Sequence, residues 1–313
     1  MIDDSTFAAG IDVGKAALDM AVTFDGRRWR FSNDGSGREE LVAELTRLGV
    51  RRVGLEASGG YERDVVDRLR SDGFDVVLLQ PRQVRAYAVY RLRRAKNDAI
   101  DAGLIAECAA ECDQARCERD PRLSALAEPL RLLEQTEDDI ARLKTRREAY
   151  RSADIRAMLV DEIARLKASR AAQIRKLRAA LAAEPDLARR FELVLSIEGI
   201  GERTALTLLI AMPELGSMSR EQAASLAGLA PFDCDSGKQK GVRRIAGGRA
   251  NVRTALYAAA LPASFRWNPA LVALYKRLTG RGNSHKKALV ACARKLLIYA
   301  NAVLARQTMW RAA

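Results

Sequence analysis

Short apolar runs alternate with turn residues at the start of the chain. AAGIDVG and ALDMAVTF are followed by a turn at Asp25-Gly26 and then by RRWRFSN, a pattern typical of three antiparallel strands. SGREELVAELTRLG has the spacing of an amphipathic helix, with Ser36 as its N-cap and Gly49 as its stop. RRVGLEAS and FDVVLLQP favour strands, whereas GYERDVVDRLRSDG and RQVRAYAVYRLR favour helices. The order predicts an α/β layer with a mixed sheet.

The middle of the chain has the composition of long helices. No glycine occurs between Gly103 and Gly199, and proline occurs there only at positions 121, 129 and 185. Leucine and isoleucine recur at roughly heptad spacing with charges between them, at Leu126, Leu130, Leu133, Ile140, Leu143, Leu159, Ile163, Leu166, Ile174, Leu177 and Leu181. An antiparallel helical hairpin and an oligomerising coiled coil both fit this pattern.

Three parts follow from these patterns. We expect an α/β domain over residues 1–120 and a helical coiled-coil region over residues 121–190. A mainly α, basic domain then covers residues 191–313.

The positive charge of the chain is confined to its last quarter. Residues 231–313 hold 16 of the 53 Lys and Arg residues but only Asp233 and Asp235 of the 40 acids, a net charge of +14, so the preceding residues carry −1. A solvated basic face is one interpretation. The scarcity of acids favours a polyanionic partner, and nucleic acid is the partner we expect.

The cysteines and the hydropathy of the chain indicate in which cellular compartment the protein works. Five cysteines, no signal peptide and no long apolar run indicate a reduced, cytoplasmic protein with no membrane partner. Cys108, Cys112 and Cys117 are spaced as ordinary helix thiols and lack a fourth metal ligand. His285 is the only histidine of the chain, which excludes zinc sites built on histidine pairs.

Four carboxylates are candidates for a metal site. Asp12 and Glu56 lie in the apolar contexts AAGIDVG and VGLEAS, and Asp98 and Asp101 stand three apart at a helix start in KNDAIDA. Strand ends of α/β sheets build sites, and converging carboxylates repel unless a cation lies between them. Their hard oxygens suit Mg²⁺ or Mn²⁺, the ions of phosphoryl transfer. Alternatively, Asp98 or Asp101 is only a first-turn or N-cap residue.

The glycine-containing stretch GIDVGK at the start of the chain suggests two other classes of protein. GIDVGK is not a phosphate-binding P-loop, because three rather than four residues separate its glycines and Ala16 follows the lysine. An actin-like ATPase or sugar kinase remains an alternative for this part. That alternative does not explain the C-terminal charge.

The last part combines a glycine turn with a basic loop. In SIEGIGERTALTLLIAM, Gly199 and Gly201 resemble the turn of a helix-hairpin-helix element, whose amides can receive a backbone phosphate; a plain helix–helix turn is the alternative. Further along, SREQAASLAGLAP predicts a helix capped by Ser219. The basic loop after it contributes candidate nucleic-acid-binding residues, namely Lys238, Lys240, Arg243, Arg244, Arg249 and Arg253, the last two beginning a helix.

Ser236, within this basic loop, has two interpretations. No histidine lies near it in sequence, which argues against a hydrolase triad. Asp235-Ser236-Gly237 is then either a turn in a phosphate-gripping loop or a nucleophile activated by metal and carboxylates from elsewhere.

The motifs together resemble those of a known family. GIDVGK, LEASGGYE, KNDAIDA, SIEGIGERTA, LAGLAP, DSGKQKGVRRIAGGRANVRTALY and KKALVACARKLL, in this order, are similar to those of bacterial IS110-family insertion-sequence transposases. The resemblance spans nearly the whole chain. It implies a RuvC-like, ribonuclease-H-type domain with a DEDD set at Asp12, Glu56, Asp98 and Asp101, then a coiled coil, then a transposase domain with Ser236 as its reactive serine.

The resemblance also implies a mechanism and partners. A covalent serine–DNA intermediate would allow strands to be cut, exchanged and rejoined without ATP, with Mg²⁺ at the DEDD site. A guide RNA would pair with element-end and target DNA, and homodimers would assemble into tetramers. Two alternatives stay open: a RuvC-like nuclease or junction resolvase in which water attacks, and a non-catalytic nucleic-acid-binding protein.

Overall fold

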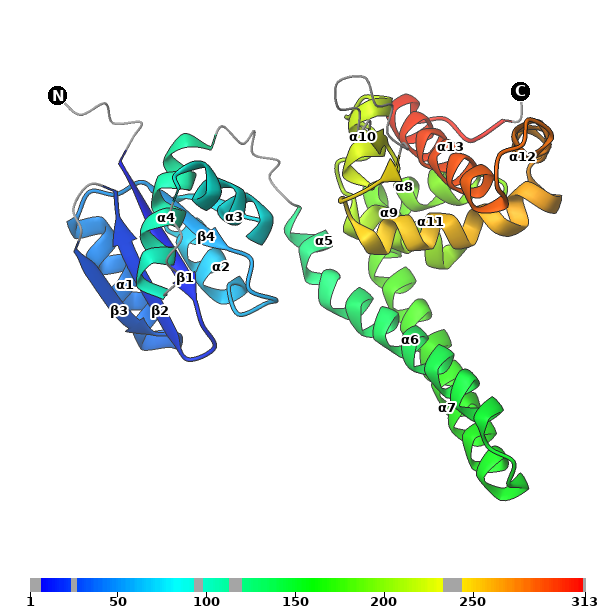
Figure 1. Ribbon diagram of the computed structural model, residues 1–313, viewed down its shortest axis with the longest axis horizontal. Coiled ribbons are helices and arrows are strands. Elements are labelled where there is room, and N and C mark those ends of the chain that lie inside the picture. The colour runs from blue at the N-terminus through cyan, green and yellow to red at the C-terminus, as the bar shows by residue number, and fades with distance from the viewer. Residues whose placement is uncertain (1–6, 24–26, 93–97, 113–119, 233–243, 312–313) are drawn as a thin grey trace. The chain divides into compact units, whose positions relative to one another are not determined.

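The computed structural model describes residues 7–23, 27–92, 98–112, 120–232 and 244–311, with only the backbone described at 98–101 (Figure 1). The chain divides into two compact units, Met1–Arg116 and Cys117–Ala313. Each unit has its own hydrophobic core. The three-part division that we expected, at residues 120 and 190, remains a prediction.

The first unit is built on a mixed five-stranded sheet. Its strands are β1 (Ala8–Val13), β2 (Ala17–Val22), β3 (Arg28–Ser32), β4 (Arg52–Glu56) and β5 (Asp75–Leu79), in the order β3-β2-β1-β4-β5. The first three form an antiparallel meander, and β4 and β5 join parallel to β1. The predicted α/β layer with a mixed sheet is therefore confirmed.

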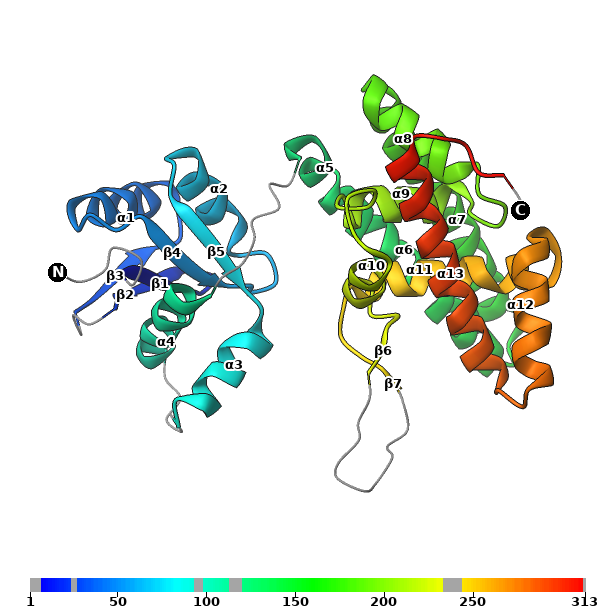
Figure 2. The ribbon, with the colours of Figure 1, turned by 90° about the horizontal axis from the view of Figure 1, so that it is seen from above.

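Helices cover both faces of this sheet (Figures 1 and 2). They are α1 (Gly35–Arg47), α2 (Arg63–Ser71), α3 (Pro81–Tyr90) and α4 (Asp98–Glu111). Apolar side chains of β1, β2 and β4 pack on α1 and α2, whereas β5 contributes to a smaller cluster with α3 and α4. Side chains alternate along a strand, so residues two apart on β1 or β4 face the same helix layer.

One helix start differs from the prediction. Ser36 was expected to cap α1, but Asp34 is the N-cap, and its carboxylate accepts a hydrogen bond of 2.9 Å from the Gly37 amide. Asp and Ser are comparable caps, and the choice between them follows from where the preceding strand ends. Gly49 does follow the helix end, with a positive φ of 69°.

The second unit is almost entirely helical. Its elements are α5 (Pro121–Ala125), α6 (Ala127–Ala149), α7 (Ala153–Ala182), α8 (Pro185–Leu195), α9 (Glu202–Ala211), α10 (Arg220–Leu226), β6 (Pro231–Phe232), β7 (Arg244–Ile245), α11 (Ala250–Pro262), the π-helix η2 (Ala263–Trp267), α12 (Pro269–Gly280) and α13 (His285–Arg306). Ser219 caps α10 as predicted, and its hydroxyl accepts from the Gln222 amide.

Helices α6 and α7 form an antiparallel pair joined by residues 150–152 (Figure 1). Leu130, Leu133 and Leu177 are buried in the core of the unit, whereas Met158, near the turn, is 71% exposed. Glu137 on α6 accepts from Arg170 on α7 (2.7 Å) and from Arg203 on α9 (2.8 Å), which ties the pair to the core. Within one chain, α6 and α7 therefore form the antiparallel helical hairpin, one of the two arrangements that the sequence left open.

Helix α13 runs through the core of the second unit. Over the described part of the chain it is the single helix long and apolar enough to cross a membrane, and 56% of its apolar window is buried inside the protein. Leu296, Leu297 and Leu304 on it belong to the main core cluster. The expectation that the chain has no long apolar run was therefore wrong for this helix. Its burial is that of a core helix.

Candidate active site

Asp12 and Glu56 lie at the ends of neighbouring parallel strands. In the pairing of β1 with β4, Gly10 lies opposite Gly54 and Ile11 opposite Leu55. Continuing this register by one residue sets Asp12 beside Glu56. Both are half-buried, each following a buried strand residue.

A third carboxylate lies in the same row, and sequence reasoning missed it. Asp19 on β2 is the antiparallel partner of Asp12, so the two side chains leave the same face of the sheet. Arg30 on β3 lies opposite Asp19, and their charged groups are 3.8 Å apart. The ion pair offsets the charge of Asp19 beside Asp12. The signal was available, because the tight turn between the two strands fixes the register.

Helix α4 packs directly on the face from which these acids project. A Cβ atom on Gly10 would collide with the backbone of Ala102 and Ala106, and one on Gly54 would meet the side chain of Ala109. Glycine at both positions therefore permits the close approach. Gly10 precedes Asp12 by two residues, and Gly54 precedes Glu56 by two, so the acids share the face that α4 covers.

The direction of α4 follows from contacts at its far end. Arg52, at the start of β4, donates to the carbonyl of Ala109 at 2.8 Å and also to that of Cys112. The C-terminal end of α4 thus lies over the strand starts, and its first turn lies toward the strand ends. Asp98 is about 6 Å of helix before Ala102, and Asp12 is about 6.6 Å of strand beyond Gly10.

This geometry brings the backbone of all four predicted acids toward one edge of the sheet. Asp98 begins α4, and Asp101 follows one turn later. The side chains of Asp98 and Asp101 are outside the described residues. No metal-binding group of three or more acids, cysteines or histidines occurs among the side chains that are described. Convergence of the four carboxylates remains a prediction.

The loop after β4 is organised by Glu62, another residue that the sequence analysis did not single out. Its Oε2 accepts from the Gly60 amide (2.8 Å), the Ser58 hydroxyl (3.0 Å) and the Ser58 amide (3.1 Å), with 9% of the residue exposed. Burial raises its pKa, but these hydrogen bonds outweigh burial and the pKa is lowered overall. Glu62 is therefore ionised and holds the loop that begins at Glu56.

Asn33 joins two turns near the acids. Its side-chain amide donates to the carbonyl of Gly14 at 2.9 Å and to that of Tyr61 at 3.3 Å. Gly14 follows Asp12 by two residues, and Tyr61 lies in the loop after Glu56. Asn33 thus links the segments that extend from both acids.

Two of the three clustered cysteines are described, Cys108 on α4 and Cys112 just after it. Cys108 is buried and free, and burial raises the pKa of its thiol to about 11. Cys112 is also a free thiol. Cys117 lies outside the described residues.

Ser236 and most of the basic loop also lie outside the described residues, as do Lys238, Lys240 and Arg243. The segment is bracketed by β6 and β7, in which Pro231 pairs with Ile245 and Phe232 with Arg244. Arg244 is exposed. The predicted roles of these residues are not tested by the fold.

Arg249, which was expected to bind nucleic acid, has partners inside the second unit. Its guanidinium donates to both carboxylate oxygens of Glu214 at 2.5 and 2.7 Å and to the carbonyl of Ala211 at 2.8 Å. Arg253 donates to the carbonyl of Gly247 at 2.6 Å. Arg249 therefore has a structural role that its position in a basic segment did not indicate.

The glycine turn connects α8 and α9, which both the helix-hairpin-helix interpretation and the plain helix–helix turn predict. Gly199 has a φ of 98°, a conformation that favours glycine, and its α-carbon faces Ala263 of η2. Gly201 is the exposed N-cap of α9, with open space where a side chain would stand. Its exposure leaves the start of α9 accessible to a phosphate, but the first-turn residue Glu202 brings a negative charge to the same end.

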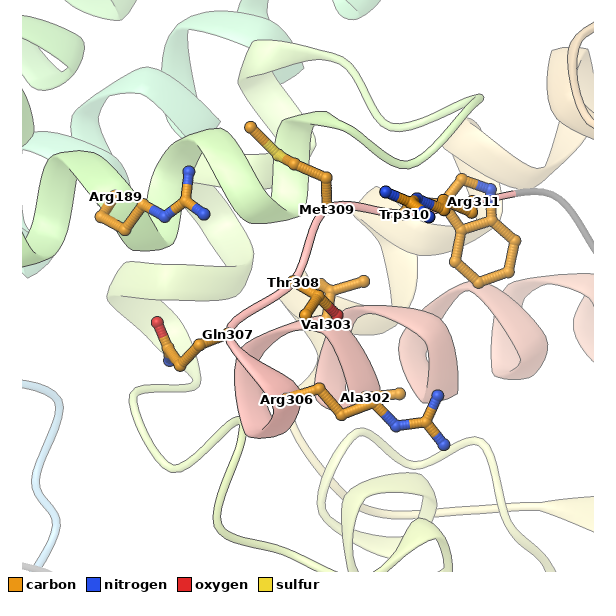
Figure 3. Close-up of a pocket in the computed structure, with 9 residues that line it drawn as sticks. All are labelled: Arg189, Ala302, Val303, Arg306, Gln307, Thr308, Met309, Trp310 and Arg311. Carbon is orange, nitrogen blue, oxygen red and sulfur yellow. The ribbon is translucent and has the colours of Figure 1, made fainter.

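A cleft in the second unit adds cations that the sequence analysis did not select (Figure 3). It measures about 600 Å³ and lies between α13, the tail after it and α8. Arg189, Arg306 and Arg311 line it. Trp310 anchors the tail, because its amide donates to the Ser196 hydroxyl at 2.9 Å and its ring centre lies 4.0 Å from that of Tyr299.

Comparison with known proteins gives the class, that of DNA transposases and recombinases. The family model for the DEDD domain of IS110 elements, described as a transposase, matches residues 9–159. A second model, described as the transposase IS116/IS110/IS902 family, matches residues 191–276. The two matches together cover most of the chain and both models describe the same family, so the chain belongs to the IS110 family of transposases. The resemblance stated from the motifs is confirmed.

Two curated relatives match nearly the whole chain. They are the pilin gene-inverting proteins of Moraxella bovis and Moraxella lacunata, each 29% identical over 311 residues, covering 94% of this chain and 94% of the relative. The expected enzyme class, a DNA transposase or recombinase, is thereby confirmed, and DNA is its partner.

Proposed function

We propose that the chain cuts, exchanges and rejoins DNA strands through a covalent intermediate on Ser236. The observation that carries the proposal is the geometry of the first unit. Strand register and the direction of α4 bring the backbones of Asp12, Glu56, Asp98 and Asp101 toward one edge of the sheet. The meander followed by two parallel strands supports the assignment of this unit as a RuvC-like, ribonuclease-H-type domain.

Asp12, Glu56, Asp98 and Asp101 are the residues proposed to hold Mg²⁺, or Mn²⁺ in its place. Their oxygens are hard donors, which fit these ions. The bound ion would neutralise charge on the phosphate oxygens during phosphoryl transfer. Asn33 and Glu62 position the two segments that carry Asp12 and Glu56.

The serine step conserves a phosphate ester. Ser236 Oγ forms a bond to phosphorus, one bridging P–O bond of the DNA breaks, and the departing oxygen takes up a proton as a hydroxyl. A strand hydroxyl then attacks the phosphoserine, the Oγ–P bond breaks, and the serine regains its proton. Lys238, Lys240, Arg243 and Arg244 would neutralise the phosphate.

Assembly and guidance are part of the proposal. The α6–α7 pair exposes Tyr150, Ile155, Met158 and Val160 near its turn, and an apolar tip of this kind supports contact with another copy in a dimer or tetramer. The net charge of +14 over residues 231–313 supports backbone binding. We propose that a guide RNA supplies the sequence reading and that the protein works in the cytoplasm.

A denaturing gel tests the covalent step. The full-length protein is incubated with Mg²⁺, labelled element-end and target DNA, and RNA transcribed from the flanks of the gene. A labelled protein-sized band is expected for the wild type and for Ser217→Ala, whose serine is exposed in the same unit. Ser236→Ala is expected to lose the band, and Asp12→Asn to lose all cutting while still folding.

Each other outcome has a defined meaning. Cut DNA without a protein-linked band would mean that Ser236 is only a turn residue. The protein would then be a metal-dependent nuclease or resolvase in which water attacks the phosphate. Binding with a steep salt dependence, and no cutting with or without Mg²⁺, would indicate a non-catalytic nucleic-acid-binding protein.

A further inference from the structure

Three aromatic rings from three elements of the second unit form an exposed cluster, which we call the aromatic patch: Phe265 of η2, Tyr275 of α12 and His285 of α13. The ring centres of Phe265 and Tyr275 are 4.9 Å apart in an edge arrangement, and those of Phe265 and His285 are 6.1 Å apart and stacked. The Tyr275 hydroxyl lies 2.6 Å from His285 Nδ1. Phe265 is 54% exposed, although it packs on both partners.

The backbone beneath the patch is fixed. The Asn268 amide donates to the carbonyl of Ala263 at 3.1 Å, which closes the π-helix, and its side chain donates to the carbonyl of Glu198 at 3.1 Å. Asn268 itself is buried. Short π-helical turns occur often at functional sites. Phe265 is therefore exposed on a turn that backbone and side-chain hydrogen bonds hold in place.

The surroundings of the patch are basic. Arg266 lies next to Phe265 and places its guanidinium 5.2 Å from the ring centre of exposed Trp267. Lys286 and Lys287 follow His285 and are exposed. Residues 244–311 contain no acid at all. This charge favours a polyanion over a protein surface of mixed charge.

Exposed rings beside cations are the combination that binds single-stranded nucleic acid. Unpaired bases stack on aromatic faces, and the cations contact the phosphates between them. Bases of a duplex are already stacked on each other, so a duplex would engage the cations but not the rings.

We propose that the aromatic patch binds unpaired bases of single-stranded DNA, with a base on Phe265 and adjacent phosphates on Lys286 and Lys287. The proposal rests on the proposed function for the source of these strands, since strand exchange leaves DNA transiently unpaired. Trp267, two residues further along η2, is a second stacking position.

The test compares single-stranded and duplex DNA of one sequence by fluorescence anisotropy with the full-length protein. Phe265→Ala is expected to weaken single-strand binding by roughly 5- to 100-fold and to leave duplex binding nearly unchanged. Phe265→Tyr should retain single-strand binding, because it keeps the ring. Leu261→Ala is the matched control, since this residue is also exposed, one helical turn earlier, but has no ring.

Several results would overturn the proposal. They are unchanged single-strand binding in Phe265→Ala, an equal loss for single strands and duplex, or a greater loss for RNA than for DNA of the same sequence. A changed oligomeric state of Phe265→Ala in sedimentation would assign the patch to a protein contact instead. Ser236→Ala should bind single strands normally, so loss of strand exchange in that variant would leave this inference intact.

Discussion

In the first unit, Asp12 and Glu56 are carried by strands of a five-stranded sheet, whereas Ser236 of the second unit belongs to the segment of sequence between β6 and β7, which have two residues each. Asp12 and Glu56 are held by register, by the close approach of α4 and by Asn33 and Glu62. On the C-terminal side of the basic loop, Arg249 binds Glu214.

The charge distribution differs in the same way. Residues 1–230 are nearly neutral, and residues 231–313 carry the excess. A metal site requires ligands within a fraction of an ångström, which packing can supply. Binding to a long polyanion depends mainly on how many positive charges contact its phosphates. The first unit should therefore be sensitive to volume, and the second to ion pairs and salt.

The largest expected effect is a volume change under α4. Gly10→Ala would force a methyl group into the backbone of Ala102 and Ala106, so we expect the first unit to lose about 3 kcal/mol of unfolding free energy. Hydrogen exchange of the β1 amides measures the unfolding free energy of the first unit separately from that of the second. Gly103→Ala is the control, because that helical glycine has open space and alanine should stabilise α4 by up to about 1 kcal/mol. Equal protection in both variants would refute the close approach.

The second prediction separates two arginines that look alike in sequence. Arg249→Gln leaves Glu214, whose side chain is 14% exposed, without its main cation and should destabilise the second unit by about 2 kcal/mol. Arg244→Gln should leave the stability unchanged. It should reduce the number of counterions released on DNA binding, measured from the salt dependence of the affinity, by about one. Thermal unfolding and salt titrations measure the two effects. If Arg249→Gln changed only the salt dependence, its assignment as a structural residue would be wrong.

The smallest expected effect concerns Glu62. Glu62→Gln should cost about 1.5 kcal/mol at neutral pH, because it weakens charge-assisted hydrogen bonds to Gly60 and Ser58. The pKa of Glu62 is lowered in the folded protein, so its contribution is present above the ordinary carboxyl range and is lost as the pH falls through the folded pKa. The difference between wild type and variant should shrink in acid. Unfolding curves across that range test it, and a difference that grows in acid would contradict the assignment.

Much of the fold followed from the sequence because its signals are local. Alternation located the strands, and the absence of glycine located the long helices. Ser36 was chosen over Asp34 because both are good caps and only the end of β3 decides between them. The apolar character of α13 was missed because its charges are interspersed along the helix.

The candidate site was predictable only in part. Asp12 and Glu56 stood out as acids in apolar strands, and their adjacency is a matter of register. Asp19 was missed because ALDMAVTF by itself does not mark its acid. Only the register set by the tight turn between β1 and β2 makes Asp19 a neighbour of Asp12. The role of Arg249 depends on Glu214, which is 35 positions away in sequence, and no local pattern contains that pairing.

The two glycines beneath α4 also provide a diagnostic signature for distant relatives. Asp12 and Glu56 are each preceded two positions earlier by a glycine, in Gly10-Ile11-Asp12 and in Gly54-Leu55-Glu56. A sequence with the acids but with bulky residues at both glycine positions could not bring its helix this near to the sheet. Searching for the glycines together with the acids would thus separate true relatives from chance matches to four scattered carboxylates.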